Sequence, residues 1–178
     1  YGVSYTGVED ADNYDRIYQT DLLGWTGSIG YNEPMAWFSS VYQTDSKNTL
    51  RAAGFYATDA ETYYDICLVR DFEGIEDMDR RAFLQSGYIK DKGYYTIPLE
   101  NPQPLEADQR FAVIVQIYTR DSMHPIAIEY VSNELTVEAD ISDGESYMSY
   151  NGSLWSHMEE ASACNACLKA YTDLTPDQ

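Results

Sequence analysis

The pattern of hydrophobic and polar positions along the chain is dense in strands and sparse in helices. Short segments rich in β-branched and aromatic residues alternate with Gly, Pro, Asn or Asp, which is typical of strands joined by turns. The pattern predicts at least eight strands: "MAWFSSVY" (35–42), "LRAAGFYA" (50–57), "TYYDICLV" (62–69), "GYYTIPL" (93–99), "RFAVIVQIY" (110–118), "PIAIEYV" (125–131), "SYMSYNG" (146–152) and "ACLKAYT" (166–172).

The segment 110–118 indicates how the strands are layered. Phe111, Val113, Val115 and Ile117 share one face, and Ala112, Ile114, Gln116 and Tyr118 share the other. Both faces are largely apolar, which predicts a central strand of a sandwich. The connections are too short for crossover helices, so the pairing is predicted to be antiparallel, and "YNGS" (150–153) predicts a tight hairpin. The expected fold class is all-β, an antiparallel β-sandwich of jelly-roll type.

The chain of 178 residues suits one domain with a real core, because a domain of this size buries roughly 70% of its unfolded surface. We expect that domain over 14–173, with residues 1–13 as a tether from a preceding domain and 174–178 as a C-terminal tail. A short helical turn is expected only within 75–87. The start at Tyr1 suggests a processed protein or an excised piece, and no apolar run approaches the roughly 18 residues that a membrane span needs.

The net charge of the chain excludes some classes of binding partner. Thirty acidic and eleven basic residues give a formal net charge of −19, which repels phosphate backbones and anionic headgroups, so we expect neither nucleic-acid binding nor membrane insertion. The acidity fits solubility outside the cell or calcium binding through carboxylates. Carboxylates gather near residues 10–15, 71–79 and 140–145, without EF-hand spacing. The candidate calcium ligands are Asp12, Asp15, Asp140 and Asp143; the alternative is that each cluster is a solvated loop.

The stretch "GWTGSIGYNEPMAWF" (24–38) is rich in glycine and tryptophan. Its glycine spacing fits neither a phosphate loop nor a dinucleotide turn, and Ser28 lacks the Gly-x-Ser-x-Gly context of a nucleophile elbow. We therefore expect Ser28 to be a turn residue. The glycines would allow a folded loop that brings Trp25, Tyr31 and Trp37 into one neighbourhood.

No catalytic residues are expected. The cysteines are Cys67, Cys164 and Cys167, all in or beside predicted strands, and His124 and His157 are the only histidines. This does not fit a papain-type nucleophile, and one Cys-x-x-Cys offers too few ligands for structural zinc. The three cysteines permit one disulfide with one thiol left over, or none, and the sequence does not choose among the pairings.

An ordered set of segments resembles the lectin-like domain that follows the catalytic domain in bacterial papain-family (C1) cysteine peptidases. The set comprises "NYDRIYQTDLLGW" (13–25), "AWFSSVY" (36–42), "LRAAGFYATDAETYYDICLV" (50–69), "SGYIKDKGYYTIPLENPQPLEADQRFAVIVQIYT" (86–119), "PIAIEYV" (125–131), "SYMSYNGSLW" (146–155) and "ACLKAYT" (166–172). The resemblance implies a jelly-roll module of a secreted or cell-wall-attached peptidase, with the protease domain on its N-terminal side. It also implies calcium in some members. Residues 70–85 are more acidic than the family pattern, and Cys164 is not a family feature.

Two functions remain open. The first is glycan or cell-wall polysaccharide recognition, with Trp25, Tyr31, Trp37 and Trp155 as candidate stacking residues; core packing is their structural alternative. The second is a docking or spacer module that packs on the protease domain without binding sugar, which predicts buried aromatic residues and an exposed apolar patch. A free-standing hydrolase is disfavoured, because no nucleophile with an oriented base is apparent.

Overall fold

A computed structural model describes residues 15–18, 27–44, 46–130, 145–158 and 164–174. Strands dominate these residues, and the one helical element with assigned bounds is a short 3₁₀ helix. The strands are β1 (Arg16–Tyr18), β2 (Gly27–Ile29), β3 (Met35–Gln43), β4 (Asn48–Ala57), β5 (Thr62–Arg70), β6 (Ala82–Ile89), β7 (Gly93–Leu105), β8 (Arg110–Thr119), β9 (Ile126–Tyr130), β10 (Glu145–Ser149), β11 (Trp155–His157), β12 (Cys164–Ala166) and β13 (Leu168–Leu174), with the helix η2 at Ile75–Arg80. All eight predicted strands are present.

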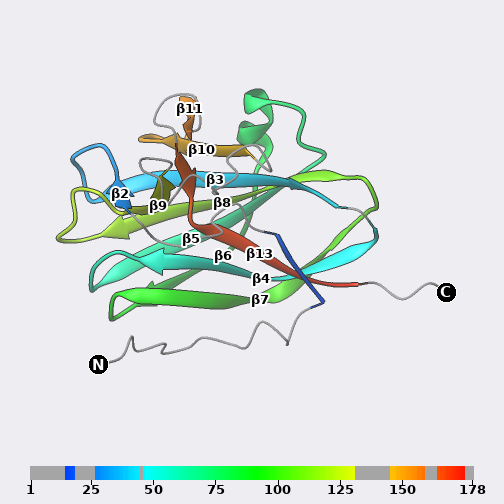
Figure 1. The fold of residues 1–178 in the computed structure, drawn as a ribbon, viewed down its shortest axis with the longest axis horizontal. Coiled ribbons are helices and arrows are strands. Elements are labelled where there is room, and N and C mark those ends of the chain that lie inside the picture. Colours follow the sequence, from blue (N-terminus) through cyan, green and yellow to red (C-terminus); the bar gives the residue numbers. More distant parts are fainter. Residues whose placement is uncertain (1–14, 19–26, 45, 131–144, 159–163, 175–178) are drawn as a thin grey trace.

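The strands form three antiparallel sheets (Figure 1). The six-stranded sheet has the order β11-β10-β3-β8-β5-β6, and the four-stranded sheet has the order β1-β13-β4-β7. A small sheet, β12-β9-β2, lies at one end. The chain passes between the two larger sheets repeatedly, as from β3 to β4 and from β4 to β5, which is typical of jelly-roll connections. The predicted antiparallel β-sandwich is confirmed.

The main core fills the space between the two larger sheets. β8 lies between β3 and β5, and its residues Phe111, Val113, Val115 and Ile117 all face this core. From the opposite sheet, Leu50 and Phe55 of β4 pack into the same cluster. β8 is therefore the central strand that its two apolar faces predicted.

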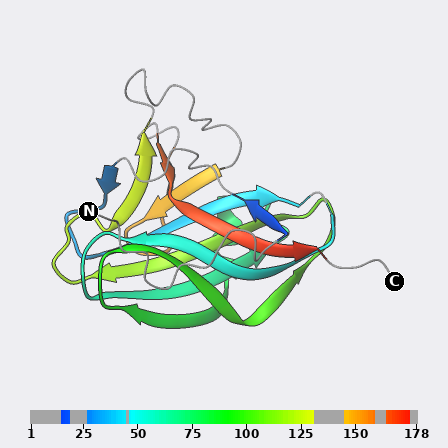
Figure 2. The ribbon, with the colours of Figure 1, turned by 60° about the horizontal axis from the view of Figure 1, so that its bottom comes forward.

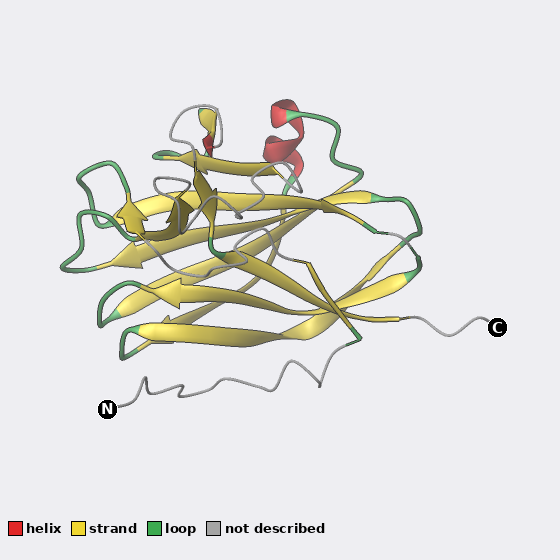
Figure 3. Cartoon of the chain, in the orientation of Figure 1, coloured by secondary structure: helices red, strands yellow, loops and turns green. Residues whose placement is uncertain are grey.

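A second hydrophobic cluster lies on the outer face of the six-stranded sheet. Ala112 and Ile114 of β8 point there, away from the main core, and Phe72 and Met78 cover them. Met78 belongs to η2, the larger helical element in Figure 3. The helical turn expected within 75–87 is thus confined to its first half, and the remainder forms the edge strand β6, which pairs with β5.

Two local expectations are corrected by the pairing of strands. Ser28 is not a turn residue: it lies in β2, opposite Ala127 of β9. The hairpin predicted at "YNGS" is present between β10 and β11, although its loop spans five residues. Gly152 in this loop has φ +78°, which glycine adopts without strain, and the Asn151 Oδ1 accepts hydrogen bonds from the backbone N–H groups of Ser153 and Leu154.

The edge strand β7 carries Pro98, Pro102 and Pro104, which have no backbone N–H to donate. β4 is the neighbour of β7 in the four-stranded sheet, and β13 runs along the other side of β4 (Figure 2). The side chain of Gln85, on β6, bridges to β7: its Nε2 donates to the Pro98 carbonyl at 3.0 Å, and its Oε1 accepts from the Glu100 N–H at 2.9 Å. Within the described parts of the chain, no helix has the length and apolarity of a membrane span.

Candidate functional site

The aromatic residues predicted from "GWTGSIGYNEPMAWF" do not form one group. Trp25 lies outside the described residues. Tyr31 packs against the main core and its ring makes an edge contact with Tyr150 at 5.8 Å between centroids. Trp37 packs instead against the outer cluster. Tyr31 and Trp37 therefore lie on opposite sides of the six-stranded sheet, and the expected common neighbourhood is not formed by these two.

Trp37 and Trp155 are largely covered. Their rings meet at 6.4 Å in a T-shaped contact, and Trp155 is 9% exposed. The Arg81 guanidinium lies 4.5 Å from the centroid of the Trp37 ring and donates to the carbonyls of Met78 and Gly152. Arg81 thereby fastens η2 to the β10–β11 loop across the indole. Trp155 is therefore a packing residue of the outer cluster, and Trp37 lies at the edge of that cluster.

The candidate calcium ligands fall mostly outside the described residues, namely Asp12, Asp140 and Asp143. The fourth, Asp15, accepts a hydrogen bond from the Leu174 N–H at 2.8 Å, so its carboxylate caps the end of β13. Among the residues that the structure describes, no group of three or more His, Cys, Asp and Glu side chains is arranged to hold a metal ion. Calcium stays a prediction.

Carboxylates of the acidic 71–79 segment serve local structure. Asp77 accepts a hydrogen bond from the Glu73 N–H and pairs with Arg80, and these contacts lower its pKa. The Asp71 carboxylate accepts from Gln109. This segment therefore uses at least these two carboxylates to build the covering loop and η2.

Cys67 lies in the outer cluster as a buried free thiol. Burial raises its pKa to about 11, while nearby Arg81 lowers it and Asp65 raises it. A thiol held protonated in this way is a poor nucleophile, because the thiolate is the reactive form. The absence of a catalytic role for Cys67 stays a prediction.

The uncovered end of the outer face carries a row of three tyrosines. Antiparallel pairing places Tyr63 of β5 opposite both Tyr88 of β6 and Tyr118 of β8. The ring of Tyr63 lies 4.9 Å from that of Tyr88 and 6.4 Å from that of Tyr118, between centroids. Their exposed fractions are 55% for Tyr63, 48% for Tyr88 and 41% for Tyr118. Aromatic faces thus meet solvent where η2 does not reach.

A polar row runs beside the tyrosines, two residues further along the same strands. Asp65 lies opposite both Ser86 and Gln116, and Gln116 lies opposite Trp37. The Gln116 Nε2 donates to the Met35 Sδ at 3.0 Å, which fixes the amide with its oxygen available. The two rows place hydroxyl, carboxylate and amide groups within reach of one ligand.

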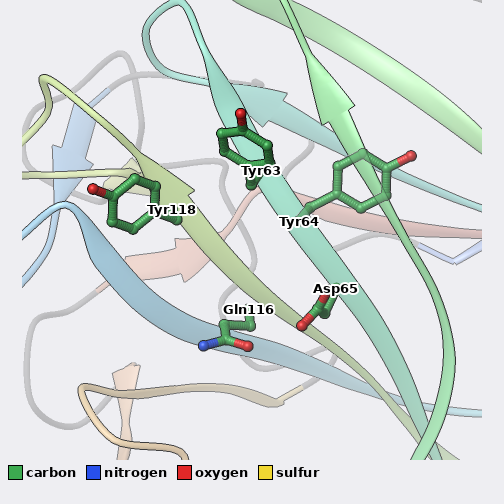
Figure 4. A pocket seen from close by; sticks show the side chains of 5 residues that line it. All are labelled: Tyr63, Tyr64, Asp65, Gln116 and Tyr118. Carbon is green, nitrogen blue, oxygen red and sulfur yellow. The ribbon is translucent and has the colours of Figure 1, made fainter.

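Where the two rows meet on β5 and β8, an open pocket of about 200 Å³ is lined by Tyr63, Tyr64, Asp65, Gln116 and Tyr118 (Figure 4). Figure 4 shows Tyr63 and Asp65 on β5 beside Tyr118 and Gln116 on β8, with the Tyr64 ring turned away from them. Partial burial raises the pKa of Tyr88 at the rim, and Glu61, Tyr63 and Asp91 add to the effect. The pocket combines aromatic faces with a few hydrogen-bonding side chains, as small-ligand sites do.

None of the pocket residues was among the sequence candidates. Gln116 and Tyr118 did carry a signal, since they are the polar end of an otherwise apolar face of 110–118. Tyr63 and Asp65 likewise alternate with the buried Thr62, Tyr64 and Ile66 in "TYYDICLV". What joins the two pairs is the register of β5 with β8, which local alternation does not contain.

Comparisons with known proteins find similar domains over most of the chain. A family model described as "Lectin like domain" matches residues 17–172. A clostridial cysteine protease, Cwp84, after propeptide cleavage, has a TM-score of 0.71 and 20% identity over 90% of this chain and 40% of that one. The cysteine protease and lectin-like domains of Cwp84, a surface-layer-associated protein of Clostridium difficile, give 0.64 and 19% over 80% of this chain and 33% of that one. A search of curated proteins finds no match.

At these identities the two structures share the fold with the chain. The chain spans less than half the length of either solved structure. The remainder of each neighbour has no counterpart in the described sandwich.

Proposed function

Because the chain belongs to the family of lectin-like domains, we propose that it is a non-catalytic accessory module of a secreted or cell-surface bacterial cysteine peptidase and recognises glycan. The observation that carries glycan recognition is the exposed tyrosine row beside Asp65 and Gln116. A sugar ring has an apolar face that stacks on an aromatic ring and hydroxyls that bind polar side chains. The pocket of about 200 Å³ suits one sugar unit of a longer chain.

The attachment to a peptidase is supported by the solved neighbours, in which a lectin-like domain accompanies a cysteine protease domain. The surface-layer association printed for Cwp84 supports a cell-surface location. The complete reading frame tests this part: a papain-like domain on the N-terminal side supports it, and a frame without one leaves a free-standing lectin as the better account.

The glycan part is tested by titrating the folded chain with a panel of cell-wall and mucin-type glycans in a calorimeter. Tyr63→Ala should weaken binding about tenfold, because it removes the central stacking surface. Tyr150→Ala is the matched control, since Tyr150 is exposed to a similar extent (48% against 55% for Tyr63) but contacts Tyr31 instead. Loss of binding in Tyr150→Ala alone would move the site to the end of the sandwich where the sequence candidate Tyr31 lies.

The alternative is a docking or spacer module, and the covered positions of Trp37 and Trp155 favour it, as that hypothesis predicted. Phe83, 61% exposed on β6, would then belong to the partner face. A flat response of the folded chain to every glycan would support this alternative. Repeating the titration in EDTA tests the calcium prediction: binding or thermal stability should fall if a bound ion supports the fold or the site.

A further inference from the structure

Asp65 is a carboxylate without a counter-ion. None of the ion pairs or hydrogen bonds found among the described residues involves its side chain, although it is only partly exposed. The nearby cations are committed elsewhere: Arg81 lies on Trp37 and binds two carbonyls, and Arg120 pairs with Glu61 at 3.6 Å. Among the described residues, no basic side chain forms an ion pair with the Asp65 carboxylate, which leaves it open to a cationic group of a ligand.

The surroundings of Asp65 favour a ligand that is both cationic and partly apolar. Tyr63 and Tyr118 offer ring faces beside it, and an ammonium group is attracted to such faces as well as to a carboxylate. Asp91 adds negative charge beside Tyr88, the neighbour of Tyr63 in the tyrosine row. The net charge of −19 repels acidic sugars and therefore also favours a cationic ligand over an acidic one.

We propose that the pocket selects hexosamine units whose amine is free, with Asp65 as the counter-ion of the ammonium group and the tyrosine row as the stacking surface for the sugar ring (Figure 4). This inference rests on the glycan-binding function proposed above. The Gln116 amide oxygen accepts a hydrogen bond from a hydroxyl of the same sugar. N-acetylation removes the positive charge and adds bulk at the position facing Asp65, so it weakens binding.

The test compares chitosan tetrasaccharide with chitin tetrasaccharide by calorimetry at low salt, and oligogalacturonate serves as the acidic probe. The wild-type chain should bind the free-amine sugar about five- to tenfold more tightly than the acetylated one, which is the scale of one charge-assisted hydrogen bond at a partly exposed site. Oligogalacturonate should not bind. Added salt should reduce the preference, because it screens the ammonium–carboxylate attraction.

Asp65→Asn should abolish the preference for the free amine, because affinity for the chitosan probe should fall to the level of the chitin probe in the same variant. Asp108→Asn is the control: it removes the same charge in the exposed β7–β8 turn, where φ is +54° and asparagine is well tolerated. This variant should keep the full preference. Circular dichroism and thermal melting confirm that both variants are folded.

Three outcomes overturn the inference. Equal binding of both sugars to the wild-type chain leaves glycan recognition standing and removes the role of Asp65. A preference that survives in Asp65→Asn places the amine elsewhere. Tetralysine that binds as tightly as the chitosan probe, and loses affinity in Asp65→Asn, makes the pocket a peptide ammonium site, and the glycan function falls with the inference.

Discussion

The two halves of the outer face of the six-stranded sheet are built by the same strands, but one half is buried and the other is exposed to solvent. In the covered half, Cys67 of β5 and Ile114 of β8 lie beneath Met78 of η2. In the open half, Tyr63 and Tyr118 occupy the same two strands and meet solvent. The sheet itself does not determine exposure; the segment between β5 and β6 does, because it covers only one half. No described segment packs over the large aromatic residues of the open half, so burial does not explain why these positions are aromatic.

The largest difference between the halves should appear on truncating one large side chain from each. Met78 is fully buried, so Met78→Ala should lower the free energy of unfolding by about 3 kcal/mol. Tyr88→Ala, at an exposed position of β6 opposite Tyr63 in the open half, should change it by less than about 1 kcal/mol. Urea denaturation measures both. Similar losses in the two variants would mean that η2 is not an integral cover.

The next effect concerns the buried thiol of the covered half. Because the pKa of Cys67 is raised from 9.0 to about 11, the unfolded thiol ionises first as the pH rises. Stability from this group is complete below pH 9 and is lost between about pH 9 and 11, by roughly 1 to 3 kcal/mol. Unfolding at pH 8 and pH 10.5 should show a smaller alkaline loss in Cys67→Ala than in the wild type. Parallel losses would contradict the burial of this thiol.

The boundary between the halves can be tested at Arg81. Arg81→Ala removes the contact with the Trp37 ring and two hydrogen bonds to carbonyls, and should cost about 1 kcal/mol. It should also shift tryptophan fluorescence to the red, because the indole becomes accessible to water. Arg80→Ala is the control: its ion pair with Asp77 and its hydrogen bonds to the Arg70 and Asp71 carbonyls are solvent-exposed, so stability should fall less than in Arg81→Ala and the emission should not shift. Unaltered emission in Arg81→Ala would place the cover elsewhere.

The smallest effect is expected at Asp77 of η2, whose ion pair with Arg80 is exposed to solvent. The Glu73 N–H and Arg80 lower the pKa of Asp77, so its contribution is present near neutral pH and is lost as the pH falls through the depressed value. Asp77→Asn should slightly lower the melting temperature at pH 6 and should reduce the further loss on acidification. Asp79→Asn, two residues along η2, should resemble the wild type in both respects. A larger loss in Asp79→Asn would contradict this assignment.

The sequence predicts the sandwich well because its strands have clear alternation. Segment 110–118 has two apolar faces and is the central strand, and the family model confirms the resemblance to lectin-like domains. β2 and β6 were missed for a common reason. Gly27–Ile29 is short and glycine-bounded, and Ala82–Ile89 follows a charged helical turn, so only their partners β9 and β5 make them strands.

The site was harder to predict than the fold, because it depends on which strands are neighbours. Trp155 was a reasonable stacking candidate from its side chain alone, yet it packs against Trp37. Tyr63 and Tyr118 are 55 positions apart and become one surface only through the β5–β8 register. Trp25 and three of the four calcium candidates lie outside the described residues, so those predictions stand as made.

The bridge from Gln85 to β7 bears on how the protein behaves when molecules crowd together. An open strand edge is a template on which a second copy can add a strand and begin a fibril. Here Gln85 already occupies the Pro98 carbonyl and the Glu100 amide, and the three prolines offer no further donors. A foreign strand arriving at β7 would leave many of its own backbone groups unpaired. At this edge, the fold itself therefore opposes the addition of a strand from a second copy.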